Sequence, residues 1–170
     1  MLPTVRRTWA PKGQTPLLGH RTRSHKKVSA IGALSLSPKR RQVGLYLHWH
    51  PDKNVTQHEL LVFLRDLRAH LCGPLILVWD RLAAHRAAAA RLRKTGGRRI
   101  QIEWLPPYAP ELNPVEYLWS NCKYHRLANH GLYDLDDIQV QARHEAENIA
   151  CEQSLLRSFV RAAGLPVRFK

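Results

Sequence analysis

Two carboxylates stand where an α/β protein can most easily build a site for a divalent cation. Asp80 directly follows LILVW (75–79), the most apolar run of the chain, and sites in open α/β sheets assemble at the carboxyl ends of such strands. Glu116 lies 36 residues further on, after the proline-rich loop LPPYAPELNP (105–114). Carboxylate oxygens are the ligands that hard cations such as Mg²⁺ prefer. The pair therefore predicts a metal site.

Both carboxylates also have an ordinary structural interpretation. Asp80 precedes an expected helix and could cap its first turn. Glu116 lies three residues after Asn113 and two after Pro114, which is the pattern of a capped helix start with a glutamate at its third position. Capping and metal binding would compete for the same oxygens, and the sequence leaves both alternatives open at each residue.

Other acidic residues and the histidines give weaker signals. Asp52, Glu103 and Glu111 are secondary candidates for a further carboxylate, at an expected turn, on an expected strand and in the proline-rich loop. His48 and His50 alternate along one strand and share a face, so they could begin a zinc site. No third zinc ligand is placed beside them, and an exposed polar strand face is the favoured interpretation.

The elements that must position these residues follow from hydrophobic periodicity. Residues 27–37 and 42–50 alternate as a β-hairpin, and residues 56–71 have helical spacing that begins with a capping box of Thr56 and Glu59. The order strand–helix–strand–helix–strand predicts an α/β core with parallel pairing. The remaining elements expected are a buried strand at 75–79, a helix at 83–94, a strand at 100–104, and helices from 113–114, at 134–150 and at 152–163.

Composition bounds the function. The 170 residues suit one domain, divided here into a basic arm (1–26), an α/β core (27–130) and a helical tail (131–170). A net charge of +14 favours polyanionic partners, while no apolar run approaches the ~20 residues of a membrane span.

Three widely spaced cysteines and the lack of a secretory signal favour the cytoplasm. The residues expected to contact a nucleic acid are Arg6, Arg7, Trp9, Lys12, Arg91, Lys94, Arg98 and Arg99.

The two carboxylate segments resemble a known family. LVWDRLAAH (77–85) followed by WLPPYAPELNPVEYLW (104–119) resembles the catalytic core of mariner-superfamily DDE transposases of the bacterial insertion-sequence type. The resemblance implies an RNase H-like mixed sheet flanked by helices, and three carboxylates that hold two Mg²⁺ or Mn²⁺ ions. It makes Asp80 the second carboxylate, Glu116 the third and His85 an accessory residue. It also implies DNA as the partner, and DNA cleavage and strand transfer as the reaction.

The sequence departs from the family pattern at its beginning. The family's first carboxylate lies on its first strand, and here no acidic residue precedes Asp52. We therefore expect a partial, N-terminally truncated domain without that first strand, with weak metal binding and no activity alone. A homodimer or a complementing upstream fragment is the expected partner. The alternative is a non-catalytic remnant that binds nucleic acid without sequence preference.

Overall fold

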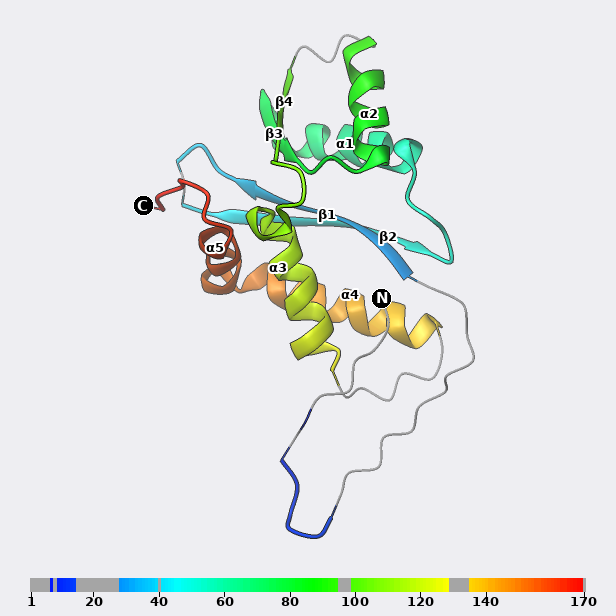
Figure 1. The fold of residues 1–170 in the computed structure, drawn as a ribbon, viewed down its shortest axis with the longest axis vertical. Coiled ribbons are helices and arrows are strands. Elements are labelled where there is room, and N and C mark those ends of the chain that lie inside the picture. The colour runs from blue at the N-terminus through cyan, green and yellow to red at the C-terminus, as the bar shows by residue number, and fades with distance from the viewer. Residues whose placement is uncertain are drawn as a thin grey trace.

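An antiparallel pair of long strands forms the middle layer of the molecule (Figure 1). In the computed structural model, which describes residues 7, 9–14, 28–39, 41–94, 99–128 and 135–169, β1 (Val28–Leu36) pairs with β2 (Val43–Pro51). Successive side chains alternate between the two faces, so β1 turns Ile31 to one side and Leu34 to the other. The predicted hairpin is confirmed, and both of its faces are covered.

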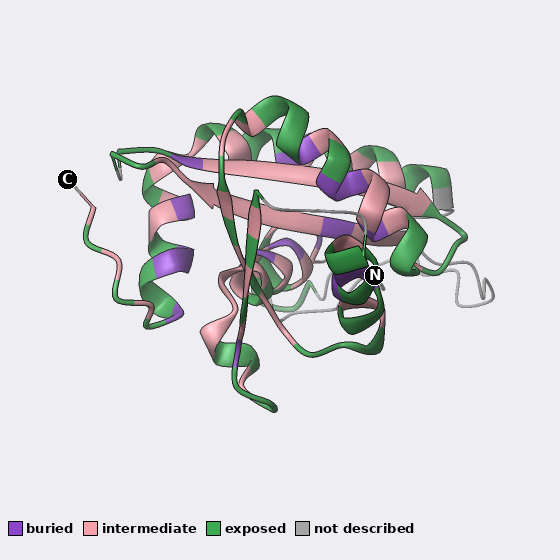
Figure 2. Cartoon of the chain, turned by 90° about the horizontal axis from the view of Figure 1, so that it is seen from above, coloured by how far each residue is buried: buried purple, intermediate pink, exposed green. Residues whose placement is uncertain are grey.

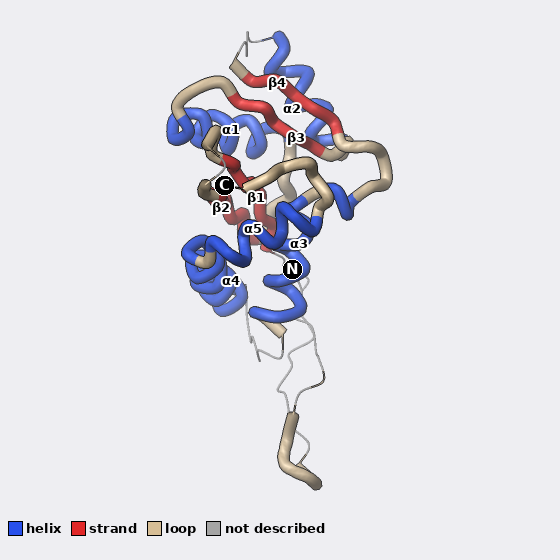
Figure 3. The backbone as a smooth tube through the Cα atoms, turned by 90° about the vertical axis from the view of Figure 1, so that its left-hand side faces the viewer, coloured by secondary structure: helices blue, strands red, loops and turns tan. Residues whose placement is uncertain are grey.

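A second layer covers one face of this hairpin. It contains α1 (Gln57–Leu71), β3 (Leu75–Trp79), α2 (Ala83–Lys94) and β4 (Ile100–Trp104). β3 and β4 pair in parallel, as predicted, and Figure 3 shows them side by side near α1 and α2. Within the described residues these strands form a sheet of their own, because no ladder connects β3 to β1.

The strand β3 is less buried than its sequence predicts. Leu77 and Trp79 pack toward α1 and α2, but Ile76 and Val78 on the opposite face are 70% and 45% exposed. The expectation that this apolar run is a fully buried strand is therefore wrong. Its physical reason is that helices cover only one face of the β3–β4 pair in the described part of the chain.

The helices of the third layer cover the other face of the hairpin. They follow a short 3₁₀ turn, η1 (Pro110–Leu112), and meet β1 and β2 through a core whose central side chains are almost completely inaccessible. Figure 2 shows these buried positions on the helices and the mostly buried or half-buried hairpin. The elements are α3 (Pro114–Asn121), the π-helical turn η2 (Cys122–Arg126), α4 (Leu135–Cys151) and α5 (Gln153–Ala162), and the central core residues are Leu118, Ile149, Leu156 and Val160.

The two most C-terminal helices, expected as a helical extension, contribute directly to this core. Arg126 at the end of η2 pairs with Glu145 of α4 and with Glu152 between α4 and α5, so one guanidinium ties three segments together. All three cysteines are free thiols, and burial raises the pKa of Cys122 to about 11. No helix among the described residues is both long and apolar enough to cross a membrane.

Candidate functional site

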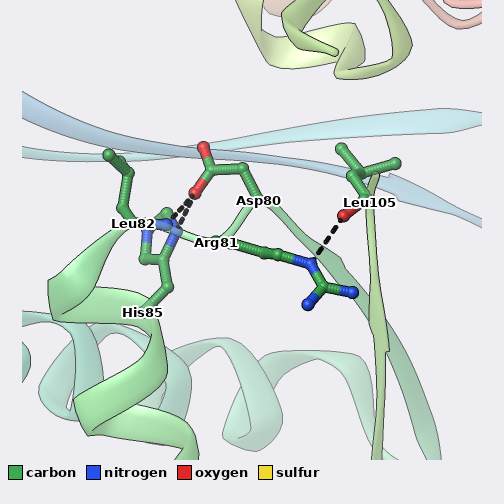
Figure 4. A network of polar contacts seen from close by, with 5 residues as sticks. All are labelled: Asp80, Arg81, Leu82, His85 and Leu105. Atoms are coloured by element: carbon green, nitrogen blue, oxygen red, sulfur yellow. Dashed lines mark hydrogen bonds and ion pairs between the residues drawn. The ribbon is translucent and has the colours of Figure 1, made fainter. Parts of the chain in front are cut away.

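Asp80 lies at the carboxyl end of β3, with one carboxylate oxygen engaged and the other turned away (Figure 4). Its Oδ1 accepts a hydrogen bond from the backbone N–H of Leu82 at 3.1 Å and lies 2.5 Å from Nδ1 of His85. The His85 ring stacks on Trp79 with centroids 4.6 Å apart and planes 7° from parallel. These contacts orient Asp80, and they leave Oδ2 pointing away from His85 and Leu82.

Hydrogen bonds connect the carboxyl ends of β3 and β4 beside Asp80. The N–H of Leu105 donates to the carbonyl of Trp79 at 2.8 Å. Nε of Arg81 donates to the carbonyl of Leu105 at 3.2 Å (Figure 4). Leu105 is also the first residue of the proline-rich loop. The loop that leads to Glu116 therefore starts from a fixed position next to Asp80.

Glu116 lies in the first turn of α3 without capping it. The side chain of Asn113 caps the helix by accepting from the N–H of Val115 at 3.1 Å. The N–H of Asn113, which a capping glutamate would bind, donates instead to the carbonyl of Pro110 at 2.9 Å, because η1 ends there. No described residue hydrogen-bonds the Glu116 carboxylate. The capping interpretation therefore holds for Asn113 and not for Glu116.

Glu116 is an exposed residue whose carboxyl group has a perturbed pKa. The pKa of Glu116 is raised, first because its carboxyl group is partly withdrawn from water and second because the negative charge of Asp80 acts on it. Two acidic groups that repel each other without a cation between them are a common property of metal sites. The charge of Asp80 therefore acts on Glu116, although the two residues are remote in the chain.

A close contact between α3 and β1 sets the direction of Glu116. Trp119, one helical turn after Glu116, packs against Gly32 in the middle of β1. A Cβ atom at Gly32 would lie only 2.8 Å from the Trp119 ring, so this glycine admits the indole. The sequence analysis did not single out three residues that contact this region, namely Gly32, Arg81 and Trp79. Only the glycine within a strand pattern was a usable signal.

The secondary acidic candidates lie apart from this pair. Asp52 occupies an exposed turn after β2, and Glu111 is exposed in η1. Glu103 accepts from the Gln101 amide at 2.6 Å on the exposed face of β4. No cluster of three or more His, Cys, Asp or Glu side chains able to hold a metal occurs in the described ranges.

In the part of the chain that the structure describes, the two strand histidines do not belong to a group of three or more metal-ligating side chains. Nε2 of His48 lies 3.8 Å from Asp66 on α1, and the rings of His48 and His50 are 6.3 Å apart. The rings of His48 and Phe63 are packed edge to face, with their centroids 5.2 Å apart. The sequence favoured an exposed polar strand face over zinc, and the structure shows His48 and His50 half-buried, because α1 packs against this face through Phe63 and Asp66.

The expected DNA contacts fall in two places. Arg7, Trp9 and Lys12 are exposed, Trp9 completely so, while Arg6 and Arg98 lie outside the described residues. The second group lies at the end of the β3–β4 layer remote from Asp80, because α2 begins beside Asp80 and runs away from it. Its described members, Arg91, Lys94 and Arg99, are exposed. Tyr108 in the proline-rich loop is also fully exposed, with a backbone φ of 58°.

Comparison with known proteins identifies the family. The family model of the DDE superfamily endonucleases matches residues 2–139. The chain belongs to this family. A chain in the crystal structure of the Mos1 strand transfer complex is similar to 98% of this chain, with a TM-score of 0.56 and 18% sequence identity, and it supports the RNase H-like α/β fold. This chain spans 52% of the length of that chain. No curated protein sequence gives a significant match.

Proposed function

We propose that this chain forms part of the catalytic domain of a mariner-type DNA transposase, with Asp80 and Glu116 as ligands of a catalytic divalent cation. The observation that supports this function best is the Glu116 carboxylate. It has no hydrogen-bonding partner in the described residues, and its pKa is raised in part by Asp80. The family resemblance implies a catalytic carboxylate at each of these positions.

The donor set suits Mg²⁺ or Mn²⁺. Both ligands offer carboxylate oxygens, and Asp80 presents Oδ2 while His85 and Leu82 hold Oδ1. Mg²⁺ is commonly held by one or two carboxylates, with water and substrate phosphates completing its coordination. When bound, the cation would supply activation of the attacking oxygen and stabilisation of the leaving oxygen at a DNA phosphodiester.

The neighbouring residues act as positioning groups in this proposal. His85 fixes the Asp80 carboxylate, and Trp79 fixes the His85 ring by stacking. Trp119 seats α3 on Gly32 and thereby determines where Glu116 points. Such support matters because a catalytic constellation must be held within about 0.5 Å of its productive geometry.

Two carboxylates compensate less metal charge than the three of the family pattern. We therefore expect weak cation binding and no DNA cleavage by these 170 residues alone. In this proposal a second copy or a complementing transposase fragment supplies a third carboxylate. Restoration of cleavage by such a fragment is the corresponding positive result.

The test combines cation binding with DNA nicking. Mn²⁺ binding is measured by calorimetry for the wild type, Asp80→Asn, Glu116→Gln and the control Glu111→Gln, which removes an exposed carboxylate from the preceding η1 turn. We expect one weak site that either ligand substitution abolishes and the control preserves. Binding that survives both ligand substitutions would contradict the assignment, and robust nicking by the wild type would contradict the expected inactivity.

A second candidate function is favoured by the net charge of +14. The chain could bind nucleic acid without catalysis, through phosphate contacts that ignore sequence. Cation binding separates the two functions. A pure binding protein would show no Mn²⁺ site that depends on Asp80 and Glu116.

A further inference from the structure

A basic surface that the proposed cation site does not use lies where α5 meets the turn between β1 and β2. The Gln153 side chain joins the two elements, because its Oε1 accepts from the N–H of Val43 at 3.0 Å and its Nε2 donates to the Val43 carbonyl at 2.9 Å. Arg157, one turn later, donates to the carbonyl of Arg41. Figures 1 and 2 show α5 and the C-terminal end beside this turn.

The charge of this surface has one sign. The segments 37–42 and 153–169 together contain six Lys or Arg residues and no Asp or Glu. No described acidic side chain forms an ion pair with any of the described members. We name these members the turn–α5 surface: Lys39, Arg41, Arg157, Arg161 and Arg168, all exposed except the half-buried Arg157.

Part of the turn–α5 surface is held in place by an aromatic ring. The guanidinium carbons of Arg157 and Arg161 lie 5.6 Å and 5.4 Å from the centroid of Phe169, which is half-buried against the core. Cation–π contacts of this kind orient guanidinium groups without neutralising them. Two positive charges are therefore fixed next to each other without a carboxylate, which costs free energy unless an anion binds.

We propose that the turn–α5 surface binds the phosphate backbone of duplex DNA. Arginine forks match phosphate oxygens, and four of the five members are arginines. An anionic membrane suits this surface less, because none of the exposed large apolar side chains in the described residues, which would add insertion into the bilayer interface to the attraction of the charges, lies in either segment.

The position of the surface relates it to the proposed cation site. Tyr117, next to Glu116 on α3, donates from its hydroxyl to the carbonyl of Ala162 on α5 at 3.1 Å. DNA held on the turn–α5 surface would therefore bind beside the helix that carries Glu116. The inference deepens the proposed function by locating a DNA contact, and it rests on that function for the identity of the polyanion.

The experiment compares two triple variants with the same change in charge. Lys39→Gln/Arg41→Gln/Arg168→Gln removes three exposed cations of the surface, whereas Lys53→Gln/Arg68→Gln/Arg143→Gln removes three exposed cations from the loop before α1, from α1 and from α4. Binding to a short DNA duplex is measured by fluorescence anisotropy in EDTA over a series of KCl concentrations. The log–log salt slope of the surface variant should fall by about 2.7, at about 0.9 for each lost phosphate contact, while the control keeps the wild-type slope.

Equal losses in both triple variants, or an unchanged slope in the surface variant, would overturn the proposal. Tighter binding to double-stranded RNA or to phosphatidylserine vesicles than to DNA would also overturn it. The single variant Arg168→Glu, with thermal melting as a folding check, repeats the test if the triple variant unfolds. Because the assay contains EDTA, it is independent of the cation site, so failure of the Asp80–Glu116 assignment and failure of this surface give different results.

Discussion

Helices α1 and α3 begin with the same sequence pattern but use its glutamate in opposite ways. In each, a capping residue is followed three positions later by glutamate, Thr56 with Glu59 and Asn113 with Glu116. In α1 the Glu59 carboxylate accepts from the N–H of Thr56 at 2.8 Å and from its hydroxyl at 2.5 Å. These hydrogen bonds, the side-chain one foremost, lower the pKa of Glu59 to about 2.

The difference at α3 arises from the turn that precedes it. In the η1 turn the N–H of Asn113 donates to the carbonyl of Pro110. This backbone donor is therefore not available to the Glu116 carboxylate. Its pKa is raised by desolvation and by Asp80 instead of being lowered by hydrogen bonds. The comparison teaches that a glutamate in a capping position is available for function when the preceding turn has already used the donor.

The largest expected effect comes from removing the contact that seats α3. Trp119→Ala should lower the free energy of unfolding by about 3 kcal/mol, because the indole packs into the core beside Gly32. It should also weaken Mn²⁺ binding by turning Glu116 away from Asp80. Urea denaturation checks the stability, with Trp9→Ala as the control because Trp9 is 100% exposed. Equal stability of the two variants would show that packing does not position α3.

The next effect concerns the two capping residues. Thr56→Ala and Asn113→Ala should each cost about 1 kcal/mol, since each loses a side-chain acceptor for the first helical turn. Only Thr56→Ala should also raise the pKa of a glutamate, that of Glu59. Denaturation combined with NMR titration distinguishes the variants, and a matching rise at Glu116 in Asn113→Ala would mean that Glu116 caps α3 after all.

A smaller effect of opposite sign is expected for the glutamates themselves. Near neutral pH, Glu59→Gln should destabilise the protein because charge-assisted hydrogen bonds to Thr56 are lost. Glu116→Gln should leave stability unchanged or increase it, since a repelled and partly desolvated charge disappears. Thermal melting of the two variants and the wild type tests this contrast. A loss of stability in Glu116→Gln would contradict it.

The pH dependence sharpens the same contrast. Glu59, with its pKa lowered from 4.5 to about 2, contributes stability that is complete above pH 4.5 and is lost as the pH falls toward 2. Glu116, with a raised pKa, costs stability when ionised, and protonation relieves this cost as the pH falls. Denaturation at a series of pH values should show the advantage of Glu116→Gln shrinking in acid. An advantage that grows in acid would contradict the raised pKa.

Much of this architecture could be predicted because local patterns agree with it. Three local patterns predicted the elements correctly, because the residues of each element determine its conformation. They are the alternation of residues 27–37 and 42–50, the capping box of Thr56 and Glu59, and the apolar periodicity of α1. The exposure of Ile76 and Val78 could not be predicted, because it depends on which elements cover the strand. An apolar run looks the same whether one or both of its faces are covered.

Sequence patterns singled out the residues of the candidate site but did not define their geometry. The chain positions of Asp80 and Glu116 marked them, yet only the structure shows that the Asn113 donor is already used and that Glu116 caps nothing. Two further contacts could not be predicted from the spacing of residues in the sequence. They are the stacking of His85 on Trp79 and the hydrogen bond from Arg81 to the carbonyl of Leu105. Such contacts depend on how strand ends and loops meet in the folded chain.

The most direct test of the convergence of Asp80 and Glu116 needs no cation. NMR titration of the glutamate side chains is carried out on the wild type and on Asp80→Asn, with Asp52→Asn as the control at an exposed turn. The pKa of Glu116 should lie above 4.5 in the wild type and fall in Asp80→Asn alone, while Glu59 stays at about 2 in all three proteins. An ordinary Glu116 pKa that does not respond to Asp80→Asn would show that the two carboxylates do not form one site.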